Sequence, residues 1–216
     1  MRALLLVSAL LLPPRPAAAS IAARVSVRAD SDSVIAVAIL NDMTAAIEDV
    51  ARRNGYDQSA RPAGWLEKAY LASASSRPDV AEYFTKQQAY ATDLSAHMDS
   101  IVTQIVTRRL DEAGYPVMRK DELRAAFLRG FHKSGDKQHA ILESMGRQAR
   151  IAITLHNFLV KIDAHVALNA KGDGLVFDRP MDQRRYDELA VAIDAANDEL
   201  VQAAEPAPAA AGGAQQ

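Results

Sequence analysis

The sequence contains no cysteine, and this absence excludes several kinds of chemistry. With none among 216 residues, the chain has no disulfide bond, no thiolate metal site, no cysteine nucleophile and no lipid-modified cysteine. Covalently attached haem, which requires a Cys-x-x-Cys-His motif, is excluded as well. Without a covalent cross-link, the fold must be stabilised by burial of apolar surface, and a chain of this length can bury enough of it.

The chain also lacks an excess of either charge and a long apolar segment after its first residues. Its 25 basic and 27 acidic residues leave a formal charge of −2, which argues against a nucleic-acid-binding protein, since that class needs a net basic face. After the N-terminal region, the longest wholly apolar stretch has seven residues, Val34 to Leu40. We therefore expect no membrane span, which needs about 20 apolar residues.

The first 19 residues have the pattern of a secretory signal peptide. A positive residue, Arg2, precedes a largely apolar run of ten residues, 3–12, and Ala17-Ala18-Ala19 provides small residues before a cleavage site between Ala19 and Ser20. A cut a few residues later is the alternative, because Arg15 lies close to this site. Cleavage leaves 23 basic and 27 acidic residues, a formal charge of −4. We expect a periplasmic or secreted protein.

The mature chain reads as a series of amphipathic helices. After cleavage it begins with a short segment, residues 24–28, that alternates as Arg-Val-Ser-Val-Arg. This alternation is typical of a strand, but the sequence predicts no partner strand, so we interpret the segment as an extended stretch before the first helix. Apolar residues then recur at helical spacing as far as residue 204. The predicted helices cover residues 33–54, 65–73, 78–113, 120–132, 136–170 and 180–204.

These helices predict an all-α fold, a single helical-bundle domain over residues 20–204. Four main amphipathic helices form it, with two short helices between them, and residues 205–216 form a disordered tail of Pro, Ala, Gly and Gln. The two long helices, 78–113 and 136–170, should pair as an αα-hairpin. Because the helices differ in length, the hairpin either protrudes beyond the bundle or is covered by a second subunit.

Histidines in an exported helical bundle raise the question of a metal site. Ferritin-like sites need repeated Glu-x-x-His pairs and further carboxylates, whereas Asp136-x-x-His139 is the one pair of that orientation in this sequence. We expect no metal site and no cofactor, although non-covalent haem ligation by Met43 and a histidine is left open.

His156 and Asp163 are the candidate polar groups of a small ligand pocket. His156 lies at the edge of the apolar stripe on the helix predicted for 136–170, and Asp163 lies near its core face. A carboxylate there needs a partner. The more conservative interpretation is a structural hydrogen bond or ion pair, and the functional interpretation is a polar point inside a ligand-binding cavity.

Charge is unevenly distributed along the second half of the chain. Residues 119–150 contain eight basic and four acidic residues, and residues 173–205 contain nine acidic and three basic residues. In the simpler account, the acidic last helix lies beside the basic short helix and stabilises it. In the other account, basic residues such as Arg129 and Lys133 bind anionic envelope components or an acidic partner.

The sequence contains fragments of catalytic motifs but no complete one, so we expect that the protein is not an enzyme. Ser134-x-x-Lys137 overlaps Lys133-Ser134-Gly135, although serine acyl enzymes keep these elements far apart in sequence. Gly130-x4-Gly135 has Asp136 where a phosphate loop needs lysine. The sequence therefore predicts an interaction, adaptor or structural module that docks a protein partner or a second copy through the long hairpin. A small-molecule- or metal-binding bundle, acting as a sensor or carrier, is the alternative.

Overall fold

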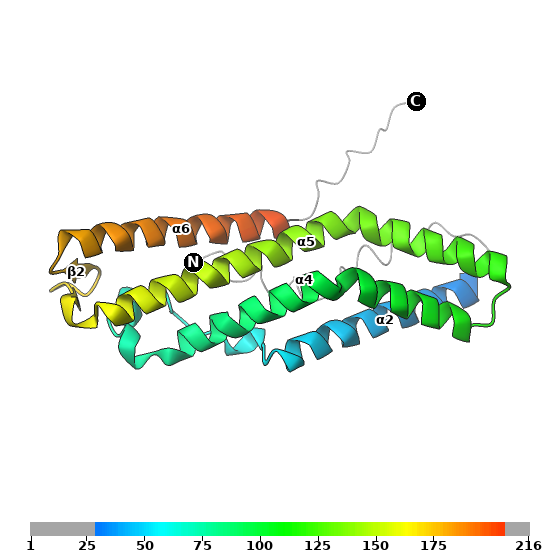
Figure 1. Cartoon of the computed structure of the whole chain (residues 1–216), viewed down its shortest axis with the longest axis horizontal. Helices are drawn as coiled ribbons and strands as arrows, with labels where there is room; N and C mark the ends of the chain where they lie inside the picture. Colours follow the sequence, from blue (N-terminus) through cyan, green and yellow to red (C-terminus); the bar gives the residue numbers. More distant parts are fainter. Residues whose placement is uncertain (1–28, 206–216) are drawn as a thin grey trace, which may run out of the picture.

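The computed structural model describes residues 29–205, and these form a helical bundle with one small β-hairpin (Figure 1). The predicted all-α class is confirmed. The signal peptide predicted for residues 1–19 and the tail from residue 206 onward lie outside the described residues. The four long helices are α2 (Ala29–Arg53), α4 (Pro78–Glu112), α5 (Val117–Lys161) and α6 (Pro180–Ala204). The short elements are η3 (Gln58–Ala60), α3 (Lys68–Leu71), η4 (Ala74–Ser76), η5 (Asp163–His165), β1 (Val166–Leu168) and β2 (Leu175–Phe177).

The two longest helices, α4 and α5, form the predicted αα-hairpin and give the molecule the shape of a rod. The other two long helices cover opposite halves of this hairpin: α6 lies along the second half of α5, and α2 lies along the second half of α4 (Figure 1). We call the end of the rod at the α4–α5 turn, residues 113–116, the tip. We call the opposite end, which carries β1 and β2, the base.

Helix α5 is longer at its start than the sequence predicts. We expected a short helix over 120–132 and a break at Ser134-Gly135-Asp136, but one helix of 45 residues runs through all of them. A glycine inside a helix costs only about 1 kcal/mol relative to alanine. Phe131 and Leu142, on either side of the glycine, are both buried in the hydrophobic core, and this packing holds the two halves in line.

Helix α5 is also shorter at its end than predicted. It stops at Lys161 rather than at Ala170, and the chain continues into an antiparallel hairpin in which Ala167 pairs with Val176. The side-chain oxygen of Asn169 accepts hydrogen bonds from the backbone N–H groups of Lys171 and Asp173. Gly172 has a φ of 72° in this turn, a conformation that favours glycine. These residues therefore form a turn, and the prediction that the helix continues to Ala170 is wrong.

The remaining predicted helices are confirmed in different degrees. Helices α4 and α6 begin at Pro78 and Pro180, as predicted, since proline is well tolerated in the first turn. Helix α2 begins at Ala29, four residues before the predicted start at residue 33. The helix predicted over 65–73 shrinks to the four residues of α3.

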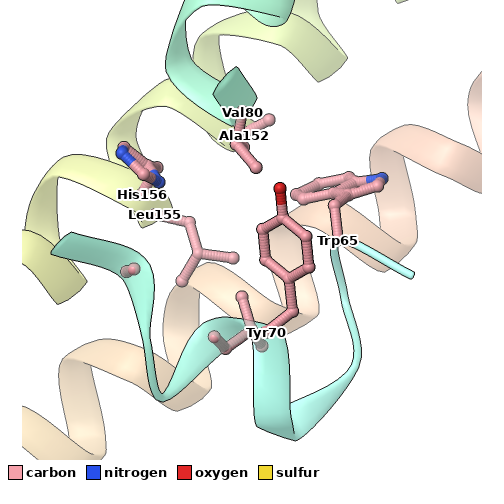
Figure 2. Close-up of a pocket in the computed structure, with 8 residues that line it drawn as sticks. Trp65, Tyr70, Val80, Ala152, Leu155 and His156 are labelled. Carbon is pink, nitrogen blue, oxygen red and sulfur yellow. The ribbon is translucent and has the colours of Figure 1, made fainter. Parts of the chain in front are cut away.

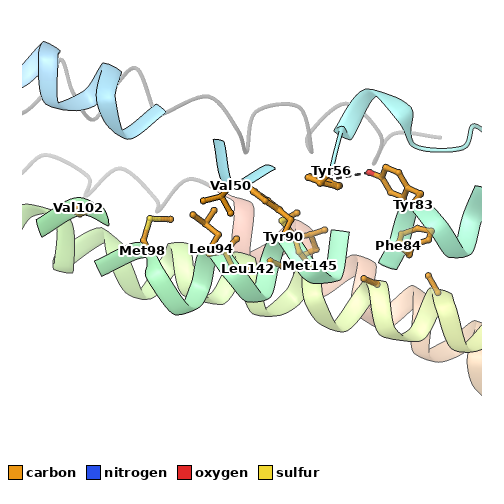
Figure 3. Packing of buried hydrophobic residues seen from close by; sticks show 14 of the residues in the cluster. Val50, Tyr56, Tyr83, Phe84, Tyr90, Leu94, Met98, Val102, Leu142 and Met145 are labelled. Atoms are coloured by element: carbon orange, nitrogen blue, oxygen red, sulfur yellow. Dashed lines mark hydrogen bonds between the residues drawn. The ribbon is translucent and has the colours of Figure 1, made fainter. Parts of the chain in front are cut away.

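A cluster of aromatic side chains fills the core where α2 and the linker meet α4 and α5 (Figure 3). Tyr56 stacks on Tyr90 with ring centroids 4.8 Å apart, and its hydroxyl lies 3.4 Å from that of Tyr83. Trp65 contacts Phe84 edge-on at 4.6 Å. Burial raises the pKa of Tyr90 to about 12. The linker from residue 54 to residue 77, although mostly irregular, is thus firmly packed.

A chain of three amides, two of them buried and one half-buried, crosses the bundle between α4, α5 and α6. Gln87 on α4 interrupts an otherwise apolar stripe, and its Nε2 donates to the Met145 carbonyl at 3.1 Å and to Gln148 Oε1 at 2.9 Å. Gln148 Nε2 in turn donates to Asn197 Oδ1 on α6 at 2.6 Å. Because buried amides must be hydrogen-bonded, this chain fixes how α4, α5 and α6 are aligned.

Candidate functional site

His156, the first candidate residue, lies on α5 beneath the linker and is buried, with 7% of its surface exposed. Burial lowers its pKa, because a charged imidazolium would lose its hydration, and the nearby carboxylate of Asp79 opposes this effect. The carboxylate near His156 therefore comes from the first turn of α4. His156 is best described as a neutral, structural histidine near neutral pH.

The cavity beside His156 is too small for a metabolite. Its volume is about 10 Å³, which is roughly the space of a single water molecule. Figure 2 shows the rings of Trp65 and Tyr70, both from the linker, across the cavity from His156 and Leu155 of α5. Pockets that hold small molecules usually have volumes of about 300 to 1,000 Å³, so this arrangement offers no chamber of that size.

Polar contacts hold the linker over this cavity. The Tyr70 hydroxyl donates to Asp79 Oδ2 at 2.6 Å, and the guanidinium of Arg77 lies 4.3 Å from the centre of the Tyr70 ring. Burial and the hydrogen bond to Asp79 raise the pKa of Tyr70 to about 12. Lys68 Nζ donates to the Tyr186 hydroxyl on α6 at 2.6 Å. These contacts indicate that the linker has a structural role and covers this part of the core.

Asp163, the second candidate residue, is exposed, so the prediction that it lies near the core face is wrong. Helix α5 ends before it, and η5 turns its side chain to solvent. The neighbouring His165 has two polar partners instead: its Nδ1 lies 3.3 Å from Asp178 Oδ2, and its Nε2 accepts from Arg179 at 2.9 Å. This contact ties the base of the β-hairpin to the start of α6.

The other two candidates, Arg129 and Lys133, are exposed on α5 and do not approach His156. Lys133 precedes His156 by 23 residues, which corresponds to about 35 Å along a helix. Neither forms an ion pair with the described part of the chain. The structure therefore does not bring the four candidate residues together in one site.

The simpler account of the uneven charge is correct only in part. The acidic helix α6 does lie beside α5, and Arg147 Nη1 is 2.9 Å from Glu199 Oε2. The segment predicted as the basic short helix instead pairs elsewhere, with Arg119 bound to Asp32 on α2 at 2.6 Å and Lys120 bound to Asp111 on α4 at 2.9 Å. The reason is that α6 ends before it reaches this part of α5.

The described residues contain no group of three His, Asp or Glu side chains placed to hold a metal ion. Within the same range, no helix has the length and apolar character needed to cross a membrane.

The surface feature that sequence reasoning missed is the position of the exposed apolar side chains. Nine large hydrophobic residues are exposed in the described part of the chain, and no such residue lies between positions 38 and 116 or between 119 and 159. Four of them belong to the tip half of the rod and four to its base, and Val191 lies on α6. The tip group is Val34, Val37, Val117 and Met118, and the base group is Val160, Leu168, Val176 and Met181.

Comparisons with known proteins give no further guide to this surface. No protein-family model matches the chain, and searches of curated proteins and of solved structures found no match.

Proposed function

We propose that this protein is an exported interaction module that docks a protein partner through the tip of its long αα-hairpin. The observation that carries the proposal is the exposure of Val117 and Met118, which directly follow the α4–α5 turn. These side chains are 72% and 80% exposed. Single exposed apolar residues are ordinary, but eight of the nine in the described part of the chain fall into two groups, one in the tip half of the rod and one at its base, with Val191 on α6 as the exception.

The chemistry of the buried groups supports the same conclusion. The amides of Gln87, Gln148 and Asn197 bond to each other across three helices, and His156 borders a cavity the size of one water molecule. A rigid core combined with apolar ends suits a spacer or adaptor, because a pre-ordered surface loses little conformational entropy on binding. Export rests on the signal-peptide pattern of residues 1–19.

Export is tested by the N-terminus of the protein made in its native host. Edman or mass-spectrometric sequencing of the protein from the envelope fraction should start at or shortly after Ser20. An intact Met1 on the native protein would contradict export by cleavage.

Docking is tested by capture from an envelope extract. The immobilised mature protein is compared with V117S/M118S and with V191S, a control in which an equally exposed valine (70%) on α6 is replaced. We expect the wild type and V191S to retain the same partner and V117S/M118S to lose it. Identical capture by all three proteins would contradict docking through the tip.

A further inference from the structure

The base of the rod carries a sheet with an unprotected edge. Strands β1 and β2 are three residues each, and the described residues contain no other strand. β2 also packs against α6, whereas in β1 only Val166 is buried, and Ala167 and Leu168 are exposed. An isolated two-stranded hairpin is only marginally stable, and a third strand stabilises it substantially.

The outer edge of β1 has backbone groups that can bind another strand. Asp178 N–H donates to the His165 carbonyl, and Asn169 N–H donates to the Gly174 carbonyl, so the residues bonded to β2 alternate along β1. The backbone groups of Val166 and Leu168 therefore point away from β2, and no backbone partner for them exists among the described residues. β1 contains no charged residue and no proline, the usual means of blocking an edge.

The sequence provides a segment with a strand-like pattern next to the start of α2. Residues 24–28, Arg-Val-Ser-Val-Arg, alternate as a strand does and lie after the predicted cleavage site, so they stay with the mature chain. They join α2 at Ala29, and the start of α2 is at the tip, because Asp32 binds Arg119 at the start of α5.

This strand cannot reach the sheet of its own chain. The 45 residues of α5 separate the tip from the base, a distance of about 65 Å along a helix. Five residues before Ala29 extend over about 17 Å at most. A partner for β1 from residues 24–28 must therefore come from a second copy.

We propose that two copies of this chain pair side by side in opposite directions, and that residues 24–28 of each copy add a strand to the outer edge of β1 in the other. The two contacts are then equivalent and the assembly is a closed dimer. Val25 and Val27 join the face of Val166 and Leu168, and Ser26 lies on the exposed face with Ala167.

Charge favours this pairing. The strand carries Arg24 and Arg28 at its two ends. Residues 163–182 at the base contain four aspartates against one lysine and one arginine, a formal charge of −2. Three of those aspartates, Asp163, Asp173 and Asp178, are exposed. The proposal depends on the proposed function in one respect, that the ends of the rod are interaction surfaces, and it names the occupant of the base.

Disulfide trapping tests the contact directly, because the natural chain has no cysteine. Mature S26C is mixed with mature A167C under mild oxidation, and the linked peptides are identified by mass spectrometry. The control mixes S26C with A195C, which places the thiol at an exposed position on α6. We expect a linked peptide that joins positions 26 and 167, and no linked peptide that joins positions 26 and 195 in the control. No such peptide, or equal linking in the control, would overturn the proposal.

Light scattering of the mature protein tests the assembly. We expect the wild type to have twice the monomer mass and S26P to have the monomer mass. With Ser26 opposite Ala167 in a strand parallel to β1, the Ser26 N–H donates to the Val166 carbonyl, and proline removes this donor. A22P, outside the strand, should remain a dimer. A monomeric wild type, an S26P protein that stays dimeric, or a ladder of larger assemblies would each overturn the closed dimer.

The two proposals fail in different ways. If positions 26 and 167 do not link but V117S/M118S still loses its envelope partner, the strand exchange is wrong and docking through the tip stands. If they link and S26P is monomeric while capture is unchanged by V117S/M118S, the dimer stands and the tip is not the docking surface.

Discussion

Helices α2 and α6 have the same length, 25 residues, and each covers half of the same hairpin, yet they are attached in different ways. α6 buries five apolar side chains in one stripe, Tyr186, Leu189, Ile193, Ala196 and Leu200. In the part of α2 whose side chains are described, only Ile39 and Val50 are buried to that degree.

α2 compensates with charged contacts at its edges. Asp42 receives Arg109 Nε at 2.6 Å and Arg108 Nη2 at 2.7 Å, both from α4. Asp32 receives Arg119 from α5 at 2.6 Å and also binds the Tyr115 hydroxyl. The comparison shows that one hairpin can hold a helix by an apolar stripe at one end and by charge pairs at the other. The two attachments should therefore differ in their response to mutation, salt and acid.

The largest effect is expected from I193A in the α6 stripe. Ile193 is 2% exposed, and deleting a buried isoleucine side chain to alanine costs about 3 kcal/mol, because it leaves a cavity. Urea unfolding followed by circular dichroism measures the change, and it should be the same at low and high salt. V191A is the control on the same helix and should cost less than about 0.5 kcal/mol. Similar losses for both variants would contradict the assignment of the stripe.

A smaller loss is expected from Q148L, which interrupts the amide chain between α5 and α6. The substitution removes one acceptor of Gln87 and leaves Asn197 Oδ1 without its donor. Leaving this half-buried polar group without its partner costs between about 1 and 2 kcal/mol. Adding N197L to Q148L should cost less than the sum of the two single changes, since both remove the same hydrogen bond. Strict additivity in this cycle would show that the bond contributes nothing to stability.

The sequence predicts α6 better than α2 for a related reason. Proline at position 180 and the stripe from Tyr186 to Leu200 define both the start and the buried face of α6. The segment from Val34 to Leu40 is apolar all round, so its spacing does not show which face is buried. The spacing of apolar residues along this helix favours Ala36 and Leu40 as core residues, but the residue that is fully buried there is Ile39, and Leu40 is half-buried.

The errors in predicting α5 have the same physical origin. Contacts between residues that are far apart in the sequence outweighed the local sequence signals. The glycines at 130 and 135 suggested a break, but packing against α4 keeps the helix continuous. The apolar residues between Ile162 and Leu168 suit a helix or a strand equally well, and pairing with β2 decides for the strand. Asp163 appeared to lie on a core face because its position was calculated from a helix that ends at Lys161.

A still smaller effect, specific to α2, is expected from D42N. Asparagine keeps the shape of the side chain but removes the charge that pairs with Arg108 and Arg109. A partly exposed ion pair of this kind contributes about 1 kcal/mol at low salt and is screened as salt increases. In D42N, the amides of α2 should therefore exchange hydrogen faster than in the wild type, whereas the amides of α6 should not change. The difference in α2 exchange rate between D42N and wild type should narrow in 1 M salt, where the Debye length is about 3 Å. A gap that is independent of salt would show that α2 is held by packing, as α6 is.

The smallest effect is the difference in stability between wild type and D42N that remains at acid pH. The bond from Arg109 holds the pKa of Asp42 at about 2, below the ordinary value of 3.8. Because the folded pKa is the lower one, the carboxylate stabilises the protein fully above pH 4, and this contribution is lost as the pH falls through 2. Unfolding of wild type and D42N should therefore differ at pH 6, differ less at pH 3 and coincide near pH 1.5, whereas I193A should stay less stable than V191A wherever the fold persists. If D42N and wild type differ by the same amount at pH 6 and pH 1.5, the charge on Asp42 does not attach α2, and the contrast between the two helices does not lie in electrostatics.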